Sequence, residues 1–390
     1  MFQVVKIISL LCCLVSVSVT AQQVIIPSPP QVAAKSYLLI DVNTGKVLVE
    51  GDADLPLAPA SLTKMMTSYI VSEEIAAGRL KEDDLVTISD DAWRRGGSAS
   101  GSSTMFLEPR TKVSVIDLMR GVIIQSGNDA SIALAQHIAG SEDAFADIMN
   151  QQAALLGMTN TTFKNATGWP AEGHITTARD LALLSKALIN DHPDHYNLYA
   201  EKYFSYNGFN QPNRNKLLFS DPDVDGIKTG HTDDAGYCLV SSKHSNGMRL
   251  VAVVMGARSE ASRATESQKL LSYGFRYYQT HQLYTNADSL STQRVWGGTV
   301  EEINLGVGNS LYLTIPRGAQ DNIKATLHID ETIKAPIKKG QELGQLIVEL
   351  EGEQLVDVPL IALDTVEEAG FFPRQWDNIK LFFANLFGTA

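Results

Sequence analysis

Cysteine is rare in this sequence of 390 residues, and positively charged residues are fewer than negatively charged ones. It contains 3 cysteines, and two of them, Cys12 and Cys13, lie near the start of the chain. If that start is removed, Cys238 is left without a disulfide partner, and the fold must depend on its apolar core. Lysine and arginine (32) are fewer than aspartate and glutamate (44), which gives a formal net charge of −12 without any run of basic residues. This balance argues against nonspecific binding to nucleic acid.

Long apolar runs are also scarce, and the clearest one lies at the N-terminus. The segment Ile7–Val19 follows Lys6 and is followed by the small residues Thr20 and Ala21. A short positively charged region, then an apolar stretch, then small residues are typical of a cleavable secretory signal. The stretch is too short for a comfortable membrane span, and no small residue precedes the cysteines as lipidation would require. We therefore predict a signal peptide at residues 1–21.

The rest of the chain has the composition of a folded protein, with 44% apolar and 19% charged residues. Its length favours two domains over one. Residues 22–283 have predicted strands near both ends and helices between them, which favours an antiparallel sheet covered by a helical cluster. The predicted strands are Ser36–Asp41, Lys46–Glu50, Tyr237–Ser242 and Arg249–Gly256. Apolar spacing predicts a helix over Ala264–His281, and the segment Arg95–Thr104, rich in glycine and serine, predicts a loop.

After residue 283 the pattern changes. Residues 284–368 consist of short alternating segments separated by turn residues, which is typical of a small all-β domain. Residues 369–390 form a predicted amphipathic helix with large apolar side chains on one face. These are Phe372, Trp376, Ile379, Phe383, Leu386 and Phe387. Such a terminal helix predicts an interfacial membrane anchor, although packing on the β domain is the plainer alternative.

Ser61 and Lys64 are the first candidate catalytic pair. They follow Pro59, which fits the first turn of a helix because the earliest N–H groups of a helix have no partner within it. A spacing of three places both side chains on one face. A serine hydroxyl becomes a nucleophile when a base takes its proton, and a lysine is such a base if burial and nearby cations lower its pKa. Alone, however, the pattern Ser-x-x-Lys is common by chance.

Two further motifs strengthen this hypothesis, namely Ser126-Gly127-Asn128 and Lys228-Thr229-Gly230. In serine acyl transfer, Ser126 would relay a proton to the leaving nitrogen and Asn128 would donate to the substrate amide. Lys228 would keep the site cationic, and Thr229 would bind a carboxylate. A tetrahedral oxyanion needs two donors, for which we predict the backbone N–H groups of Ser61 and His231.

The whole chain resembles the low-molecular-mass penicillin-binding proteins that are serine-type D-alanyl-D-alanine carboxypeptidases. The resemblance rests on the three motifs, with Gly127 where the shared signature has aspartate. Further matching segments are Ser126-Gly127-Asn128-Asp129-Ala130, Thr177-Ala178-Arg179-Asp180, Asn213-Arg214-Asn215, Asp225–Thr232 and Ala235-Gly236-Tyr237. Arg214 and Arg263 match arginines near the family's site.

The resemblance implies an α/β domain of the penicillin-binding and serine β-lactamase type, followed by a small all-β domain and an anchor helix. It also implies an enzyme at the periplasmic face of the bacterial inner membrane. That enzyme would remove the terminal D-alanine from peptidoglycan pentapeptide stems through an acyl-enzyme on Ser61, and β-lactams would acylate it. No metal or other cofactor is expected.

A class A β-lactamase is the nearest alternative. It would need a glutamate that activates the deacylating water. Glu172 is the only glutamate in the loop Asn165–Thr176, and nothing in the sequence marks it as a base, which disfavours this alternative. A transpeptidase or endopeptidase of the same fold stays open, because the choice of acceptor leaves no motif. The intact motifs disfavour a wall-binding scaffold with an inactive site. Pro193, between His192 and His195, disfavours a metal hydrolase.

Overall fold

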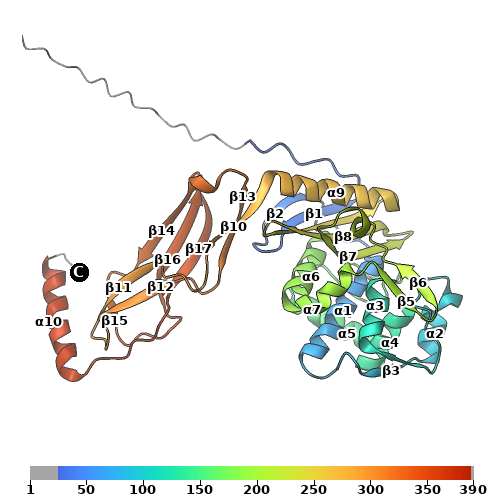
Figure 1. The fold of residues 1–390 in the computed structure, drawn as a ribbon, viewed down its shortest axis with the longest axis horizontal. Coiled ribbons are helices and arrows are strands. Elements are labelled where there is room, and N and C mark those ends of the chain that lie inside the picture. Colours follow the sequence, from blue (N-terminus) through green and yellow to red (C-terminus); the bar gives the residue numbers. More distant parts are fainter. Residues whose placement is uncertain (1–24, 388–390) are drawn as a thin grey trace, which may run out of the picture.

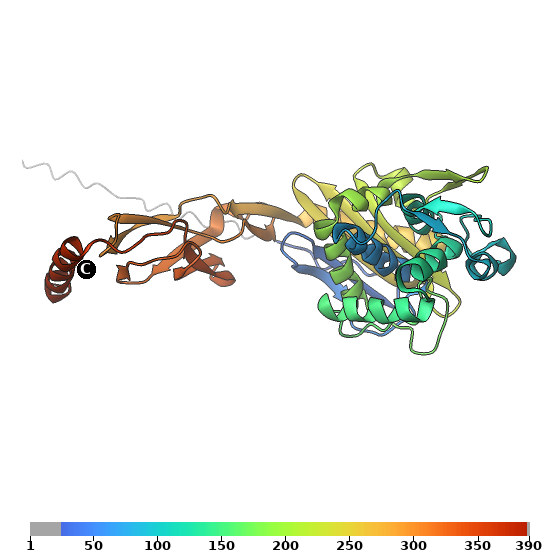
Figure 2. The ribbon, with the colours of Figure 1, turned by 90° about the horizontal axis from the view of Figure 1, so that it is seen from below.

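The structure, a computed structural model, describes residues 25–387, except for the side chains of 384–387. The predicted signal peptide, residues 1–21, lies outside the described residues. Figure 1 shows a larger part of mixed helices and strands and a slender part made mainly of strands, with helix α10 at the far end. The view from below in Figure 2 shows the two parts end to end.

A five-stranded antiparallel sheet forms the centre of the larger part, in the order β2-β1-β9-β8-β7. Its strands are β1 (Ser36–Asp41), β2 (Val47–Gly51), β7 (Val224–Thr232), β8 (Gly236–Ser245) and β9 (Met248–Ala257). Strands from both ends of this region therefore pair, and the predicted antiparallel sheet is confirmed. Because β7 is an edge strand, one side of its backbone is left for other partners.

A helical cluster covers one face of this sheet. Its helices are α1 (Lys64–Ala76), α2 (Asp90–Gly96), α3 (Val115–Ile123), α4 (Asn128–Ala139), α5 (Glu142–Leu155), α6 (Ala178–Asp191) and α7 (Pro193–Tyr196), whereas the short α8 (Leu217–Ser220) packs on the other side of the sheet. Ser114 and Thr177 cap α3 and α6, since their hydroxyls accept from the N–H groups of Asp117 and Asp180. Two small two-stranded sheets join the cluster, β3 (Leu85–Thr87) with β4 (Lys112–Ser114) and the hairpin β5 (Tyr203–Tyr206) with β6 (Phe209–Pro212).

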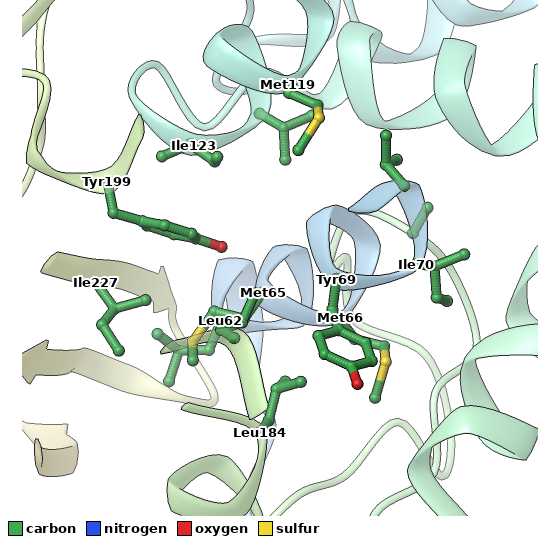
Figure 3. Packing of buried hydrophobic residues seen from close by; sticks show 14 of the residues in the cluster. Leu62, Met65, Met66, Tyr69, Ile70, Met119, Ile123, Leu184, Tyr199 and Ile227 are labelled. Carbon is green, nitrogen blue, oxygen red and sulfur yellow. The ribbon is translucent and has the colours of Figure 1, made fainter. Parts of the chain in front are cut away.

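Helix α1 runs through this cluster, its residues Lys64–Ser72 are buried, and Figure 3 shows apolar side chains packed around it. Its Met65, Met66 and Ile70 pack among side chains from α3, α6 and β7. Each fully buried side chain of this size contributes roughly 1.5–3 kcal/mol. This packing holds the start of α1, and thus Lys64, in a fixed place against the sheet.

The opposite face of the sheet is covered by α9 (Glu260–Tyr277), with a second apolar cluster between them. The predicted helix Ala264–His281 is wrong at both ends. The Ser259 side chain accepts from the Ser262 N–H and caps the helix, which therefore begins at Glu260, before the predicted start. At the other end, Tyr278 already belongs to strand β10 (Tyr278–Tyr284). Pairing of β10 with β13 replaces the last helical turn. The predicted loop Arg95–Thr104 also begins too early, because Arg95 and Gly96 end α2.

The slender part is all-β, as predicted. A six-stranded sheet has the order β14-β16-β17-β12-β11-β15, and β10 pairs with β13 beside it. The strands are β11 (Ser291–Trp296), β12 (Glu302–Gly306), β13 (Leu311–Pro316), β14 (Ile323–Ile329), β15 (Ile333–Lys334), β16 (Glu342–Leu350) and β17 (Glu353–Ala362). Two small apolar clusters form its core.

The two parts meet at a buried carboxylate, Asp41, at the end of β1. Its Oδ2 accepts hydrogen bonds from Thr280 Oγ1 at 2.5 Å and Thr314 Oγ1 at 2.8 Å. Lys46 Nζ also donates to the carbonyl of Thr314. Polar contacts from β10 and β13 therefore fix the slender part to the central sheet.

The chain ends in α10 (Phe371–Phe387), which lies beside β11. Leu381 is buried, and the Asp377 carboxylate accepts from the Gly297 N–H. Residues of the predicted apolar face are exposed, with Phe372 at 83% and Trp376 at 61%. Leu386 and Phe387 lie outside the described side chains. Within residues 25–387, no helix has the length and apolar content needed to cross a membrane.

Candidate active site

The three sequence motifs meet where α1, α4 and the edge strand β7 come together. Ser61 lies in a short 3-10 turn (Ala60–Thr63) that leads into α1, rather than in the α-helix itself as predicted. Gly230 of β7 packs against this turn, and a Cβ there would come within 3.1 Å of the Pro59 carbonyl oxygen. A small residue at position 230 therefore lets β7 lie close to the serine.

Lys64 is buried to 1% exposure and holds its Nζ at the centre of the site. The Nζ lies 3.2 Å from Ser61 Oγ, 2.7 Å from Asn128 Oδ1 and 2.5 Å from the Thr167 carbonyl oxygen. Burial and, after it, the charge of Arg214 lower the pKa of Lys64 to about 7. At neutral pH a large fraction of this lysine is therefore neutral and able to take a proton from Ser61.

Ser126 and Lys228 form a second buried pair. Lys228 Nζ donates to Ser126 Oγ at 2.9 Å. Ser126 has a φ of 60°, a backbone conformation that is uncommon for residues other than glycine. Burial lowers the pKa of Lys228 well below its usual value, and the charges of Lys64, Arg214 and Arg263 add to this effect. The pair can pass a proton towards a leaving group that lies beside Ser126.

Asn128 and its neighbour Asp129 begin α4. The side-chain amide oxygen of Asn128 accepts from Lys64, as given above. The Asp129 carboxylate is fully buried and accepts from Thr104 Oγ1 and from the backbone N–H groups of Met105 and Leu107. It thereby fixes the loop that carries Ser103 next to the site. The sequence marked Asp129 only as part of a matching segment, because its partners come from a loop without regular structure.

A polar cavity of about 260 Å³ lies over these residues. Its lining residues are Ser61, Ser103, Ser126, Arg214, Thr229, Gly230, His231, Tyr237, Glu260 and Arg263. Four predicted site residues thus line the cavity, whereas Lys64, Asn128 and Lys228 lie behind its wall. Arg263 is anchored by donating to the Gly230 carbonyl oxygen, and its guanidinium lies over the Tyr237 ring. The arginines make one end of the cavity suitable for a carboxylate.

Glu172 does not line this cavity. It lines a neighbouring cavity with Trp169 and His174. His192 and His195 lie away from the site, where their rings contact Glu73, Ser72 and Glu82. Over residues 25–387 the structure brings together no group of three side chains suited to a metal ion.

Comparison with known proteins identifies two regions of the chain. The family described as D-alanyl-D-alanine carboxypeptidase matches residues 23–259, and the C-terminal domain of penicillin-binding protein 5 matches residues 278–368. D-alanyl-D-alanine carboxypeptidases DacC and DacA of Escherichia coli are 49% and 46% identical to this chain. These matches cover 92% and 93% of the chain and 91% of each relative.

Solved structures agree with these matches. The crystal structure of penicillin-binding protein 5 from Haemophilus influenzae superposes with a TM-score of 0.82 at 41% identity, over 88% of this chain and all of that one. The resemblance drawn from the motifs, and the fold class that it implied, are therefore confirmed.

Proposed function

The chain belongs to the family of serine-type D-alanyl-D-alanine carboxypeptidases, and we propose that Ser61 is the nucleophile of its active site. The enzyme removes the terminal D-alanine from peptidoglycan pentapeptide stems. The observation that carries the proposal for Ser61 is the 3.2 Å contact between its Oγ and the buried Nζ of Lys64. A lysine with a pKa of about 7 is a suitable base for a serine hydroxyl.

In the proposed acylation step, Ser61 Oγ attacks the carbonyl carbon of the penultimate D-alanine and transfers its proton to Lys64. The backbone N–H groups of Ser61 and His231 stabilise the oxyanion. The C–N bond then breaks while Ser126 relays the proton from Lys64 to the leaving D-alanine nitrogen, which leaves Lys64 neutral and the Ser126 hydroxyl intact, and Lys228 holds that hydroxyl in place. Asn128 orients Lys64 and the substrate amide. Water then hydrolyses the ester, which returns the Ser61 hydroxyl and releases the shortened stem.

We assign the cationic end of the cavity to the terminal carboxylate of the substrate. Thr229 would donate a hydrogen bond to it, while Arg214 and Arg263 supply positive charge. The chemical requirement for a free carboxylate beside the scissile bond favours a carboxypeptidase substrate, and the same cavity accepts the carboxylate of a β-lactam. Acylation by β-lactams is typical of the family.

Two measurements on the mature protein test this assignment. Fluorescent penicillin should label the protein covalently, with the adduct on the peptide that contains Ser61, and Ser61→Ala should abolish labelling. Ser100→Ala, an exposed serine outside the cavity, is the matched control. Label on another residue, or undiminished label in Ser61→Ala, would contradict the assignment of Ser61 as the nucleophile.

Incubation with a pentapeptide muropeptide should release free D-alanine. Cross-linked products would instead indicate transpeptidation, and shortened cross-links would indicate endopeptidase action.

We propose further that α10 anchors the enzyme to the outer leaflet of the inner membrane, so that the enzyme works at its periplasmic face. Exposed Phe372, Trp376 and Ile379 recur along one face of the helix, and Asp377 is turned towards the β-rich part. Contiguous exposed aromatic side chains of this kind favour an interfacial position. The proposed organisation is a signal peptide at 1–21, a catalytic domain at 22–283, a β domain at 284–368 and an anchor at 369–390.

Vesicle sedimentation tests the anchor. The mature chain should sediment with phospholipid vesicles, whereas a chain truncated before Ala369 should stay in the supernatant. Replacing Phe372 and Trp376 by serine tests the exposed face itself, with Arg374→Ser as the control on the same helix. Equal sedimentation of the full and truncated chains would remove the anchor proposal.

A further inference from the structure

The segment Asn165–Trp169 forms one wall around Lys64 although it belongs to none of the three motifs. The Thr167 carbonyl accepts from Lys64, and Thr67 Oγ1 donates to the Ala166 carbonyl at 2.8 Å. Gly168 has a φ of +84°, and a Cβ there would lie 1.8 Å from the Ala60 carbonyl oxygen. The segment therefore packs directly against the turn that carries Ser61, and its position sets one of the contacts of Lys64.

Asn165 closes this segment on itself. Its side-chain oxygen accepts from the backbone N–H groups of Thr167, Gly168 and Trp169 at 3.2, 2.8 and 3.2 Å. These bonds make the segment rigid, but they do not tie it to the helices around it. The Thr67 hydrogen bond holds the segment to α1, and a tie to further helices would fix the acceptor of Lys64 more firmly.

Glu142, at the start of α5, provides such a tie. Its Oε1 accepts from the Ala166 N–H at 3.1 Å, and its Oε2 pairs with Arg95 of α2 at 2.7 Å. The Arg95 guanidinium also lies 5.8 Å from the centre of the Trp169 ring. One carboxylate thus joins two helices to the segment beside Lys64.

An ordinary helix-end role does not account for this arrangement. Acidic residues are common in the first turn of a helix, and both Glu142 and Asp143 lie in the first turn of α5. Asp143 is exposed, whereas Glu142 is only 7% exposed. A carboxylate that only interacts with the helix dipole has no reason to be buried, because burial of a charge costs free energy unless the charge is paired.

We propose that Glu142, together with Arg95, is a positioning residue for Lys64, which it serves by holding the Asn165–Trp169 segment and its Thr167 carbonyl in place. This inference rests on the proposed role of Lys64 as the base for Ser61. Glu142 touches neither the substrate cavity nor Ser61, and it acts through the backbone of the segment.

The charge of Glu142 gives the proposal a readout that a purely structural role would not change. The pKa of Lys64 is lowered by burial and by Arg214, and it is raised by Asp129 and Glu142. Lys228 and His174 also face Lys64. Removal of the Glu142 charge should therefore lower the pKa of Lys64, so that the neutral base forms at lower pH.

The test compares Glu142→Gln with Asp143→Asn in the full mature protein, by the rate constant of acylation with fluorescent penicillin between pH 5 and 9. Glutamine keeps an acceptor for the Ala166 N–H but loses the charge. The acid limb of Glu142→Gln should move to lower pH, on the order of half a pH unit for a screened charge. Asp143→Asn removes a carboxylate from the same helical turn and should match the wild type.

Glu142→Ala removes the charge and the contact with the segment. Its plateau rate should fall about tenfold, the effect of displacing a catalytic contact. Arg95→Gln should add little to the Glu142→Ala loss, because both changes break the same connection. If Glu142→Ala does not fold, Glu142→Gln still carries the test. An unmoved acid limb in Glu142→Gln, or a plateau rate of folded Glu142→Ala equal to that of the wild type, overturns the proposal. Wild-type protein that is not labelled on Ser61 would instead overturn the proposed function.

Discussion

The two parts of the molecule differ most in what they bury. The larger part encloses ionisable side chains, among them Lys64, Asp129, Glu142 and Lys228, inside or beside its main apolar cluster. In the slender part, among the described residues after Tyr277, Thr314 is the one buried polar side chain. Its interior otherwise consists of aliphatic residues such as Leu305 and Leu346.

This difference indicates that the larger part carries the chemistry and that the slender part supports it. Burial of an ammonium or a carboxylate is unfavourable unless each is paired, so a core that keeps four of them is organised for reactivity. An aliphatic core contributes stability and rigidity without chemistry. We therefore expect changes at the buried polar residues to affect the reaction more than stability, and changes in the β-rich core to do the opposite.

Lys64→Met should give the largest effect. Loss of the base should reduce penicillin acylation by about a thousandfold or more, since a serine hydroxyl without a base is a poor nucleophile. The free energy of unfolding should change by no more than about 1–2 kcal/mol. Removal of a buried amine is favourable, but Asn128 and Thr167 lose their donor. Stopped-flow acylation and urea denaturation measure the two quantities. A variant that acylates normally would remove Lys64 from the mechanism.

Leu346→Ala is the converse change in the β-rich part. Leu346 is fully buried in β16, and its truncation should destabilise that part by about 2–5 kcal/mol. The acylation rate constant at 25 °C should stay within about twofold of the wild-type value, because no contact of the site depends on this core. Scanning calorimetry and acylation kinetics provide the check. A large loss of acylation in folded protein would show that the two parts are coupled.

The pH dependence of the acylation rate tests the same comparison at the buried Lys64. Burial lowers the pKa of Lys64 to about 7, so the base is protonated and inactive below that pH and neutral above it. Acylation should therefore fall about tenfold for each pH unit below 7 and level off above it. A profile that stays flat down to pH 5 would contradict this pKa. The far-ultraviolet circular dichroism at pH 5.5 serves as the control for folding.

Local sequence patterns predicted much of this architecture. Ser114 and Thr177 cap helices because their hydroxyls satisfy N–H groups within the next turn. The Asn246–Gly247 turn joins β8 to β9 with both residues at positive φ, which these two residue types tolerate. The three motifs likewise led to Ser61, Lys64 and Lys228, because reactive side chains are visible in a sequence.

What the sequence could not predict depends on tertiary contacts. The acceptor of Lys64 at Thr167 is a backbone carbonyl, which any residue type could supply. Glu142 has the pattern of an ordinary helix-start acid, and only the folded chain brings it to Ala166 and Arg95. The helical spacing that continues to Tyr278 was misleading because pairing with β13 outweighed the local preference.

Thr314→Val should give the smallest effect, at the point where the two parts meet. Valine keeps the shape of the buried threonine but loses the hydrogen bond to Asp41, which Thr280 and the Asn43 N–H still contact. The Thr314 hydroxyl also bonds to Thr44 Oγ1, so two hydrogen bonds are lost, and the expected destabilisation is about 1–2 kcal/mol because the other contacts of Asp41 compensate in part. Limited proteolysis across Tyr277–Tyr284 should become faster, while acylation of Ser61 stays unchanged. Thr326→Val on β14, away from the junction, is the control, and equal proteolysis of the two variants would show that Asp41 does not hold the parts together.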